Sequence, residues 1–292
     1  MLIELSSDIA DIVEKIGPSV VQVQGDRRPA SGLVYAPERV LTTSAAIGRE
    51  EHPRVRSADG QVFDGEVVGW HSNTRLALLK VPGFNSRPAP IGVMPRVGHL
   101  AIAMARSWSN FVTVTSGLVS VIGGPLRVGH RRTIEQVIRT SAPMHEGFAG
   151  GALLGADGTL IGVTTAASIR GLGVSIPADV AWAAAAEIEK QGTLKRGYIG
   201  IAALPVRVPE KQKAQAGTDN ALLVLSVKDG SPASTAGLIV GDLLLSLDGQ
   251  ALSSPDDLLD MLVGERVGRL VSFQVLRGGA PAKVPVSVAE RS

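Results

Sequence analysis

The dominant feature of the sequence is a long succession of short apolar segments between residues 20 and 176. Each segment is β-branched or alternates apolar with polar side chains, and Gly, Pro, Asp or Asn closes it. Many short strands closely spaced by turns are typical of all-β barrels and sandwiches. The 34 glycines and 17 prolines of the 292 residues fit this reading. The predicted strands are 20–24, 32–35, 40–43, 62–69, 76–81, 99–104, 113–121, 133–140, 152–154, 160–165 and 173–176.

Helical spacing occurs at both ends of this β-rich part. Apolar side chains over residues 8–16 predict a helix that begins at Ser7 or Asp8 and ends at Gly17. Residues 178–190 are alanine-rich, with Pro177 before them, and predict a second helix.

The second helix and the polar stretch 191–197 mark a predicted domain boundary. We predict a first domain over residues 1–192 and a second over 197–292. The second is long enough to be a compact α+β domain. Its predicted elements are strands at 198–203, 222–227, 243–247, 271–277 and 282–288 and helices at 231–236 and 255–263.

Composition excludes several classes of site. Cysteine is absent, so disulfides, thiolate metal sites and a Cys nucleophile are impossible. The 29 basic and 27 acidic residues give a net charge of only +2, so we expect no nucleic-acid partner. The five histidines show no ligand spacing, so we expect no metal site and no cofactor.

Targeting signals are also missing from the sequence as written. No apolar run approaches the roughly 18 residues needed to span a bilayer. The start, Met1-Leu2-Ile3-Glu4-Leu5, lacks a basic region followed by a long apolar stretch. The sequence as written is therefore expected to be cytoplasmic. A periplasmic or membrane-tethered location stays open if an N-terminal segment has been removed.

Several motifs occur in a fixed order along the first domain. They include Ser31-Gly32-Leu33-Val34, Leu76-Ala77-Leu78-Leu79-Lys80-Val81 and Gly147-Phe148-Ala149-Gly150-Gly151. In order and spacing, nearly all of residues 8–190 resembles the HtrA/Deg family of trypsin-fold serine proteases. Further stretches carry the resemblance: 11–21, 40–42, 59–60, 63–69, 112–120, 152–154 and 173–177.

The second domain resembles a PDZ domain. Tyr198-Ile199-Gly200-Ile201 is similar to its first strand, and the motifs at 230–233, 236–238 and 241–242 are also typical. Together the resemblances imply a mainly β fold. We expect a trypsin-like double six-stranded antiparallel β-barrel with a cleft between the barrels, followed by a small α+β PDZ domain.

The family's catalytic triad is not matched residue by residue. The family's His position, after the strand that ends in Leu41-Thr42, is Ala45 here. The Asp position, directly before Leu76, is Arg75, and the nucleophilic Ser position is Ala149. An engineered Ser→Ala replacement would explain Ala149 but not Ala45 and Arg75, so natural loss of the site is the simpler account.

These substitutions remove the chemistry of the triad. The Ala149 methyl has no lone pair for acyl transfer, and the Ala45 methyl cannot take a proton. Arg75 is permanently cationic and cannot stabilise an imidazolium. We therefore predict that this is not an enzyme but an inactive homologue, a pseudoprotease.

Alternatives remain open. His145-Glu146 is an acid–base pair in principle, or a polar surface loop. Ser44 is next to the His position, but neighbours on a strand point to opposite faces. An active endopeptidase with non-standard catalytic residues is one alternative function, and a purely structural oligomer is another.

Two loops are expected to keep binding functions. The resemblance implies that the backbone N–H groups of Gly147, Phe148 and Ala149 form a residual oxyanion pocket. Phe148 is bulkier than the family's usual polar residue and is expected to obstruct the cleft.

In the second domain, the resemblance implies that Tyr198, Ile199, Gly200 and Ile201 grip a terminal carboxylate. The predicted helix 255–263 would form the wall of the groove. The expected pocket residues are Leu259, Leu262 and Val263, although Leu258 and Leu262 fit the core equally well.

The expected partners follow from the resemblance. They are polypeptide C-termini or unfolded protein segments, an active HtrA-type relative, and further copies of the chain in a trimer. The expected role is that of a scaffold, an adaptor or a chaperone-like regulator.

Overall fold

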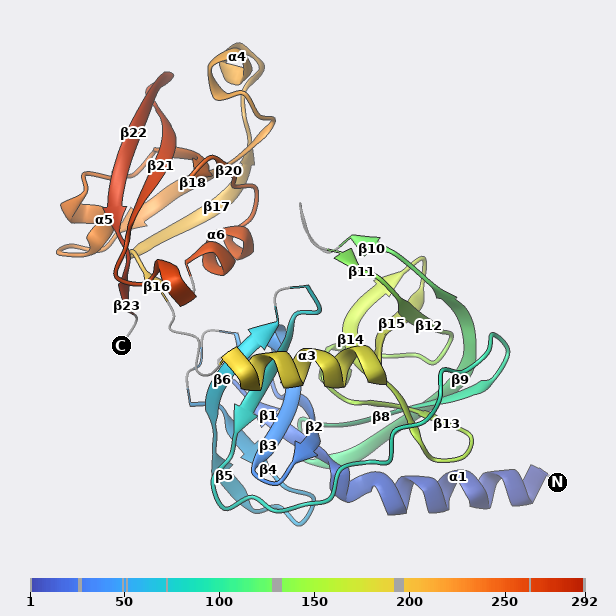
Figure 1. Ribbon diagram of the computed structural model, residues 1–292. Helices are drawn as coiled ribbons and strands as arrows, with labels where there is room; N and C mark the ends of the chain where they lie inside the picture. The colour runs from blue at the N-terminus through green and yellow to red at the C-terminus, as the bar shows by residue number, and fades with distance from the viewer. Residues whose placement is uncertain are drawn as a thin grey trace. The chain divides into compact units, whose positions relative to one another are not determined.

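The computed structural model describes residues 2–25, 28–48, 50, 52–71, 73–127, 133–191, 197–262 and 264–290. The chain divides into two compact units, Met1–Thr193 and Leu194–Ser292 (Figure 1). Each unit has its own hydrophobic core. Residues 192–196, where the domain boundary was expected, lie outside the described residues. None of the helices in the described ranges is long and apolar enough to cross a membrane.

The first unit begins with a seven-stranded antiparallel sheet, one strand more than the barrel that the resemblance implies. Five strands were predicted from this part of the sequence. The predicted strand 62–69 is two strands that meet at Gly65, and residues 54–56 form a further strand that was not predicted. The Gly65 N–H donates to the Pro53 carbonyl at 2.9 Å, next to the Arg54–Asp64 pair of β4 and β5. In spatial order the strands are β5 (Val62–Asp64), β4 (Arg54–Arg56), β1 (Val20–Gln24), β2 (Ala30–Ala36), β3 (Arg39–Thr43), β7 (Leu76–Lys80) and β6 (Glu66–His71).

A closed six-stranded barrel follows, so the expected mainly β fold is confirmed. The predicted strand 133–140 is divided between a two-stranded ribbon, β10 (Leu126–Arg127) with β11 (Thr133–Ile134), and the barrel. The barrel strands are β12 (Val137–Thr140), β15 (Leu172–Pro177), β14 (Leu160–Ile169), β13 (Ala152–Gly155), β8 (Leu100–Ser107) and β9 (Phe111–Gly123).

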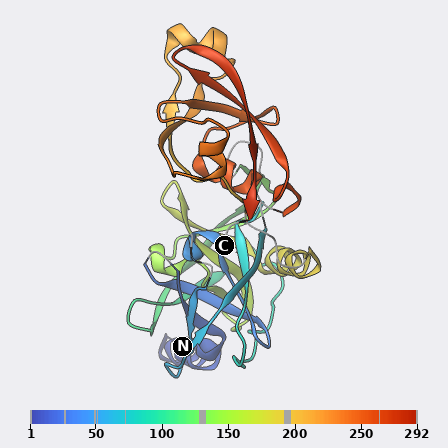
Figure 2. The same ribbon diagram turned by 90° about the vertical axis from the view of Figure 1, so that its left-hand side faces the viewer.

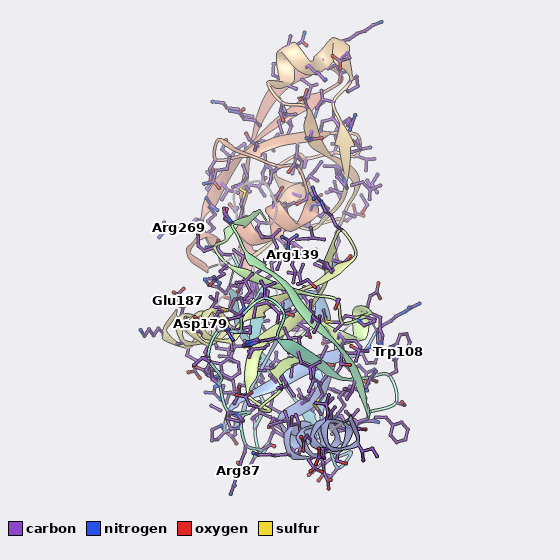
Figure 3. All side chains as sticks on the ribbon, turned by 90° about the vertical axis from the view of Figure 1, so that its right-hand side faces the viewer. Arg87, Trp108, Arg139, Asp179, Glu187 and Arg269 are labelled. Carbon is purple, nitrogen blue, oxygen red and sulfur yellow. The ribbon has the colours of Figure 1, made fainter. Side chains whose placement is uncertain are left out.

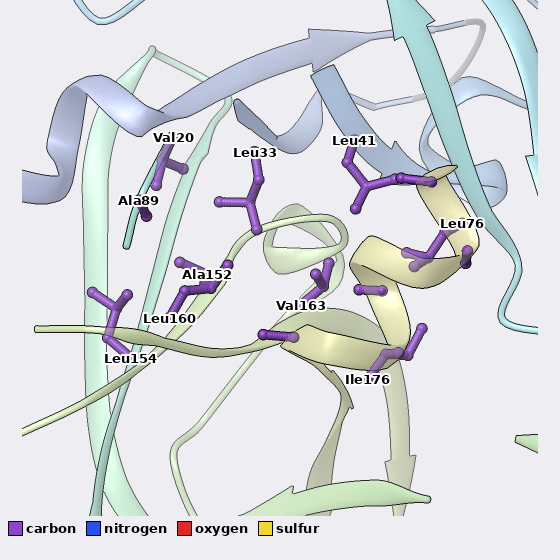
Figure 4. Packing of buried hydrophobic residues seen from close by; sticks show 14 of the residues in the cluster. Val20, Leu33, Leu41, Leu76, Ala89, Ala152, Leu154, Leu160, Val163 and Ile176 are labelled. Carbon is purple, nitrogen blue, oxygen red and sulfur yellow. The ribbon is translucent and has the colours of Figure 1, made fainter. Parts of the chain in front are cut away.

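One apolar cluster joins the two sheets of the first unit (Figure 4). Leu33 and Leu41 come from the first sheet, and Val163 and Ile176 come from the barrel. All four are almost completely buried. Each buried side chain of this kind contributes about 1.5–3 kcal/mol, so the cluster holds the two sheets against each other.

Two longer helices flank the first unit. The helix α1 (Leu2–Ile16) begins earlier than predicted, and its Ile12 and Val13 pack against the same cluster. The helix α3 (Ala178–Gln191) lies against β6 and β7 (Figures 1 and 2). The short helices of the unit are η1 (Gly17–Ser19), α2 (Ser44–Ile47) and η2 (Glu146–Phe148).

The second unit is built on an antiparallel sheet that has β17 at one edge and β22 at the other. The main order is β17 (Ile201–Arg207), β18 (Asn220–Val227), β19 (Leu243–Leu247), β21 (Leu270–Arg277) and β22 (Ala280–Ser287), with β20 (Gln250–Ala251) beside β19. A separate pair joins β16 (Gly197–Tyr198) to β23 (Ala289–Glu290). The helices are η3 (Glu210–Gln212), α4 (Lys213–Ala216), α5 (Pro232–Thr235), α6 (Pro255–Met261) and η4 (Gly264–Arg266).

An ion pair between the buried Asp242 and the partly exposed Arg277 anchors the sheet of the second unit. The Asp242 carboxylate, just before β19, accepts hydrogen bonds from Arg277 Nε and one terminal guanidinium nitrogen at 2.8 and 2.7 Å. It also accepts the Ile239 N–H at 3.0 Å. Burial by itself would raise the pKa of the Asp242 carboxyl, but the hydrogen bonds from Arg277 and Ile239 outweigh burial and lower it.

This pair makes the second unit sensitive to acid. Because the folded-state pKa of Asp242 is lowered, its stabilisation is present above the unfolded value of about 3.9 and is lost as pH falls through the lower folded value. We expect the hydrogen-exchange protection of peptides from 238–247 and 271–277 to fall below about pH 4. Asp242→Asn should lower protection at pH 7 and flatten this dependence.

The tryptophans provide an internal control, because Trp70, Trp108 and Trp182 all belong to the first unit. Their fluorescence should be the same in the Asp242→Asn variant and the wild type at pH 7. Equal pH dependence of exchange in the two proteins would contradict the assignment.

Candidate functional site

The three positions predicted for the triad, Ala45, Arg75 and Ala149, lie in segments that meet in the first unit. Ala45 is exposed in α2, a single helical turn that Thr43 caps by accepting the Ala46 N–H at 3.2 Å. The expectation of strand-like alternation at Ser44 is therefore wrong, because Ser44 is in this helix. The Ser44 N–H donates to the Arg75 carbonyl at 2.8 Å, which places α2 beside the Asp position.

Ala149 completes the group from the other side. It is buried, and its side chain clusters with those of Ala30 and Ala46. Its carbonyl accepts the Ser31 N–H at 3.0 Å, so it is tied to β2. The structure thus brings the three positions together around α2, with two methyl groups and one half-buried arginine residue.

The backbone N–H groups of the Gly147–Gly151 loop all have acceptors within the protein. The turn of η2 provides most of them, because it directs the N–H groups back onto the residues that precede it. A substrate carbonyl would have to displace these acceptors before it could bind here. The donor–acceptor pairs are Gly147 N–H to His145 Nδ1 (3.1 Å), Phe148 N–H to the His145 carbonyl (2.9 Å), Ala149 N–H to the Glu146 carbonyl (3.0 Å), Gly150 N–H to the Thr164 carbonyl (2.8 Å) and Gly151 N–H to the Phe148 carbonyl (2.9 Å).

Side chains from both sheets hold this arrangement. The buried Ser31 hydroxyl donates to the Gly147 carbonyl at 2.8 Å and accepts the Arg106 N–H at 2.8 Å. The Thr164 hydroxyl donates to the Phe148 carbonyl. Gly150 has φ +84°, and a Cβ there would lie 2.2 Å from the Ser31 carbonyl oxygen, so only glycine fits.

Phe148 does not obstruct the surface as expected. Its ring is completely buried in the barrel core beside Val119, Ile138 and Leu153. The gain from burying a large apolar ring explains this inward orientation. The His145 ring covers it edge-on, with the two ring centroids 4.9 Å apart.

His145 and Glu146 are exposed, and no interaction between their side chains is found. His145 Nδ1 accepts the Gly147 N–H, so in the neutral ring the proton is on Nε2. The nitrogen that could act as a base is therefore already engaged. No hydroxyl among the described residues lies within hydrogen-bond distance of His145.

A hydroxyl, an imidazole and a carboxylate do occur in series elsewhere in the first unit. Thr74 Oγ1 lies 2.9 Å from His71 Nδ1, and His71 Nε2 lies 3.2 Å from the Glu187 carboxylate. Glu187 belongs to α3 and is labelled in Figure 3. The Thr74 N–H also donates to Nδ1, so the ring proton is on Nε2 and is directed at Glu187.

The order of hydrogen bonds in this series, from hydroxyl to imidazole to carboxylate, is that of a catalytic triad, but the hydroxyl is not accessible to a substrate. Thr74 is only 5% exposed, and its hydroxyl also accepts the Leu76 N–H at 3.4 Å. The group therefore closes the turn before β7 and links it to α3. The sequence analysis did not identify these partners of His71. The His-x-x-Thr spacing was the available signal.

The loop at Ile199–Ile201 has the opposite hydrogen-bond state from the Gly147–Gly151 loop. Its carbonyls are used, since Ile199 accepts the Ala233 N–H at 2.9 Å and Gly200 accepts the Lys228 N–H at 2.8 Å. The N–H groups of Ile199, Gly200 and Ile201 have no acceptor in the described part of the chain. Three successive donors without protein acceptors form a site for an anion.

Two neighbours of this loop fix its shape. Gly200 has φ +82°, and a Cβ there would lie 2.3 Å from the Ser231 Cβ, so the loop requires glycine. Tyr198 pairs with Ala289 across β16 and β23, so it belongs to a strand that supports the loop.

The helix α6 lies beside β17 and presents one of the expected groove residues (Figure 1). Leu259 is 45% exposed. Leu262 is only 3% exposed and is part of the core with Leu258, so the expectation of a groove role for Leu262 is not met. Leu258 and Leu262 are four residues apart and share the inner face, while Leu259 points away from it. Val263 lies outside the described residues.

The start of α6 is well fixed. Ser254 Oγ accepts the Asp257 N–H at 3.1 Å, and the Asp257 carboxylate accepts the Ser254 N–H at 2.9 Å, which forms a capping box. Burial by itself would raise the pKa of the Asp257 carboxyl, but hydrogen bonds from Ser253 and Ser254 lower it overall. The cap therefore orients the helix that presents Leu259.

Comparison with known proteins covers both units. A model of the trypsin-like peptidase domain matches residues 30–163, and a PDZ domain model matches residues 197–288. The putative serine protease HhoA of Synechocystis sp. is 30% identical over 266 residues, which cover 86% of this chain and 68% of that protein. The chain belongs to the HtrA/Deg family.

Two further relatives agree with this assignment. The putative serine protease HhoB of Synechocystis sp. is 29% identical over 325 residues, which cover 95% of this chain and 78% of that protein. The solved structure of the HtrA-type protease AlgW with a tripeptide is 27% identical, with a TM-score of 0.57. That match covers 97% of each chain.

Within this HtrA-family chain, the peptidase model spans Ala45, Arg75 and Ala149, and the PDZ model spans the Ile199–Ile201 loop. No group of three or more His, Cys, Asp or Glu side chains that could hold a metal ion is found over the described ranges. The candidate sites are therefore two backbone loops. The N–H groups of Gly147–Gly151 are bonded to acceptors of the protein, and those of Ile199–Ile201 have no acceptor among the described residues.

Ser31 provides a test of the occupied loop. Ser31→Ala removes both hydroxyl bonds and leaves the buried Gly147 carbonyl without that donor. We expect the free energy of unfolding of the first unit to fall by about 1–3 kcal/mol, measured by urea denaturation with tryptophan fluorescence. The control is Ser120→Ala, whose hydroxyl bonds the Leu118 carbonyl at an exposed site. Equal effects of the two substitutions would contradict a stabilising role for Ser31.

Proposed function

We propose that this HtrA-family chain is a pseudoprotease that binds polypeptide C-termini through its PDZ domain without cleaving them. The observation that carries the proposal is the contrast between two backbone loops. The N–H groups of Gly147–Gly151 are satisfied by the protein, whereas those of Ile199–Ile201 have no acceptor among the described residues.

Loss of proteolysis is supported first by side-chain chemistry. Ala45, Arg75 and Ala149 supply neither a base, nor a carboxylate, nor a nucleophile. In a working triad, removal of the nucleophile or the base lowers kcat by about a millionfold, and removal of the other groups adds little. The residual catalysis of such variants, about a thousandfold over water, comes from the oxyanion hole and substrate binding.

The hydrogen bonds within the Gly147–Gly151 loop weaken even this residual catalysis by the oxyanion hole. Oxyanion stabilisation needs donors that are preorganised toward the developing charge. Here the Gly147 N–H is directed at His145 Nδ1, and the Ala149 N–H is directed at the Glu146 carbonyl. Both donors would first have to be released.

Peptide binding is supported by three features that lie side by side in the second unit. The open N–H groups at Ile199–Ile201 fit a carboxylate. The strand β17 is at the edge of its sheet, where a peptide can add as a further strand. Leu259 on α6 offers an apolar contact next to that edge. The AlgW relative, solved with a tripeptide, agrees with this use of the fold.

A chain that binds polypeptide ends without hydrolysing them is suited to the role of a scaffold, adaptor or chaperone-like regulator. Its partners would be C-termini or unfolded segments of other proteins. Mixed assembly with an active HtrA-type relative, or a homotrimer, would place the PDZ domain next to other copies of the fold.

The alternative is an active endopeptidase with non-standard residues. The relatives, which are named serine proteases, favour it. Against it, the only base nitrogen of His145 is engaged by Gly147, and the hydroxyl of Thr74 is buried. His145 and Thr74 are therefore the residues that the activity test replaces to examine this alternative.

The activity test uses fluorescent casein and a fluorophosphonate probe. We expect neither turnover nor labelling by the wild type, because no nucleophile is available at Ala149. Ala149→Ser should also stay unlabelled, since Ala45 offers no base. Activity that survives purification would contradict the proposal, and its loss in His145→Ala or Thr74→Val would identify the residues responsible.

The binding test uses the full chain and peptides that end in an apolar residue. We expect amidation of the peptide C-terminus to weaken binding by about 10- to 100-fold, because it removes charge-assisted hydrogen bonds. Leu259→Ala should weaken binding, measured by fluorescence anisotropy. Leu270→Ala is the matched control, since Leu270 is also exposed but belongs to β21. Equal affinity for free and amidated peptides would overturn the carboxylate assignment.

A further inference from the structure

The free edge of β17 is the place where a bound peptide would pair, and the register of β17 with β18 shows which backbone groups it offers. In an antiparallel pair, residues alternate between those whose N–H and C=O face the partner strand and those whose groups face away. The outward-facing residues of β17 are therefore the only ones that can bond an added strand.

Both ends of the pair fix this alternation. At one end the Lys228 N–H donates to the Gly200 carbonyl. Ile201 and Val227 are therefore a non-hydrogen-bonded pair, in which the N–H and C=O of each residue face away from the other strand. At the other end the Val208 N–H donates to the Asp219 carbonyl, so Arg207 and Asn220 are also a non-hydrogen-bonded pair. The outward residues of β17 are thus Ile201, Ala203, Pro205 and Arg207.

The bulge in this pair does not disturb the result. The register shifts between Ala202 and Ala203, and the extra residue is Leu225 on β18. The residue paired with Ala203 is Val224, and both of its backbone groups are directed away from β17: its N–H donates to the Asp242 carbonyl and its carbonyl accepts the Gly241 N–H. Ala203 therefore faces the free edge, as the alternation requires.

Pro205 interrupts the row of outward donors. Proline has no N–H, so the edge offers a donor at Ile201 and at Ala203 but none at Pro205. Its ring also occupies the space from which an N–H would reach a neighbouring strand. This placement costs β17 no bond to β18, because the nitrogen of Pro205 faces away from that strand.

We propose that Pro205 limits recognition by this PDZ groove to the last three residues of a bound C-terminus. The inference rests on the proposed function. With the carboxylate at Ile199–Ile201, an antiparallel ligand places its last residue opposite Ile201 and its third-from-last residue opposite Ala203. The fifth-from-last residue falls opposite Pro205, where its carbonyl finds no donor and the pair keeps at most one bond, from the ligand N–H to the Pro205 carbonyl.

The side chains read by this short ladder are also defined. Ile201 and Ala203 both pack partly against the core of the second unit and so share one face of β17. Residues opposite each other in a sheet point to the same face. The last and third-from-last ligand side chains therefore point to the face that carries Ile201 and Ala203. The small Ala203 leaves room there for a large apolar group.

The test measures affinity against peptide length with the full chain. Peptides that share one apolar C-terminal sequence are acetylated and made three, four, five and seven residues long. We expect affinity in the wild type to change less than twofold beyond three residues. In Pro205→Ala, which regains the N–H, the five- and seven-residue peptides should bind about three- to tenfold more tightly, and the tripeptide should be unaffected.

The control is a proline at the other edge of the same sheet. Pro285 lies in β22 and pairs with Ser272, far along the sheet order from β17. Pro285→Ala should leave the affinity of every peptide as it is in the wild type. A gain in Pro285→Ala as large as that in Pro205→Ala would overturn the assignment to Pro205.

A ligand-side measurement requires no change in the protein. N-methylation of the amide of the third-from-last residue should weaken binding more than tenfold, because that amide pairs with Ala203.

Failure of the inference differs from failure of the proposed function. A wild-type affinity that rises steadily to five or seven residues would overturn the inference while peptide binding stands. No binding at any length would overturn the proposed function, and the inference with it.

Discussion

The functional assignment of this chain depends on where its backbone N–H groups find acceptors. A buried donor without an acceptor is costly, so each glycine-rich loop must either satisfy its donors internally or leave them for a ligand. The N–H groups of Gly147–Gly151 are bonded within the protein, and those of Ile199–Ile201 have no acceptor among the described residues.

The closed state of the first loop is maintained from several directions. His145 caps the loop through its ring nitrogen, Ser31 holds the Gly147 carbonyl, and Phe148 is buried in the barrel core. Release of the Gly147 N–H toward an oxyanion pocket would have to break its hydrogen bond to His145. The three substituted triad positions and the closed loop therefore point in the same direction, although they are independent features.

The open loop belongs to a similarly well-supported frame. Asp242 and Arg277 anchor the sheet, the Ser254–Asp257 capping box fixes the start of α6, and Gly200 allows the close approach of Ser231. On this frame the edge strand β17 determines how much of a ligand can be paired. A proline whose nitrogen faces the free edge leaves the sheet intact and shortens the surface that a peptide can use.

Much of this protein could be predicted from its sequence, because strand periodicity, turn residues and motif order are local properties. They indicated the mainly β fold and the PDZ domain. The assignment of Ala45, Arg75 and Ala149 to the triad positions stays a prediction. Other properties depend on partners that are distant in sequence. The acceptors of the Gly147–Gly151 donors, the inward position of Phe148, the burial of Leu262 and the Thr74–His71–Glu187 series were decided only by tertiary structure. The physical reason is that a hydrogen-bond acceptor or a buried environment is supplied by other segments, which the chain brings together only when it folds.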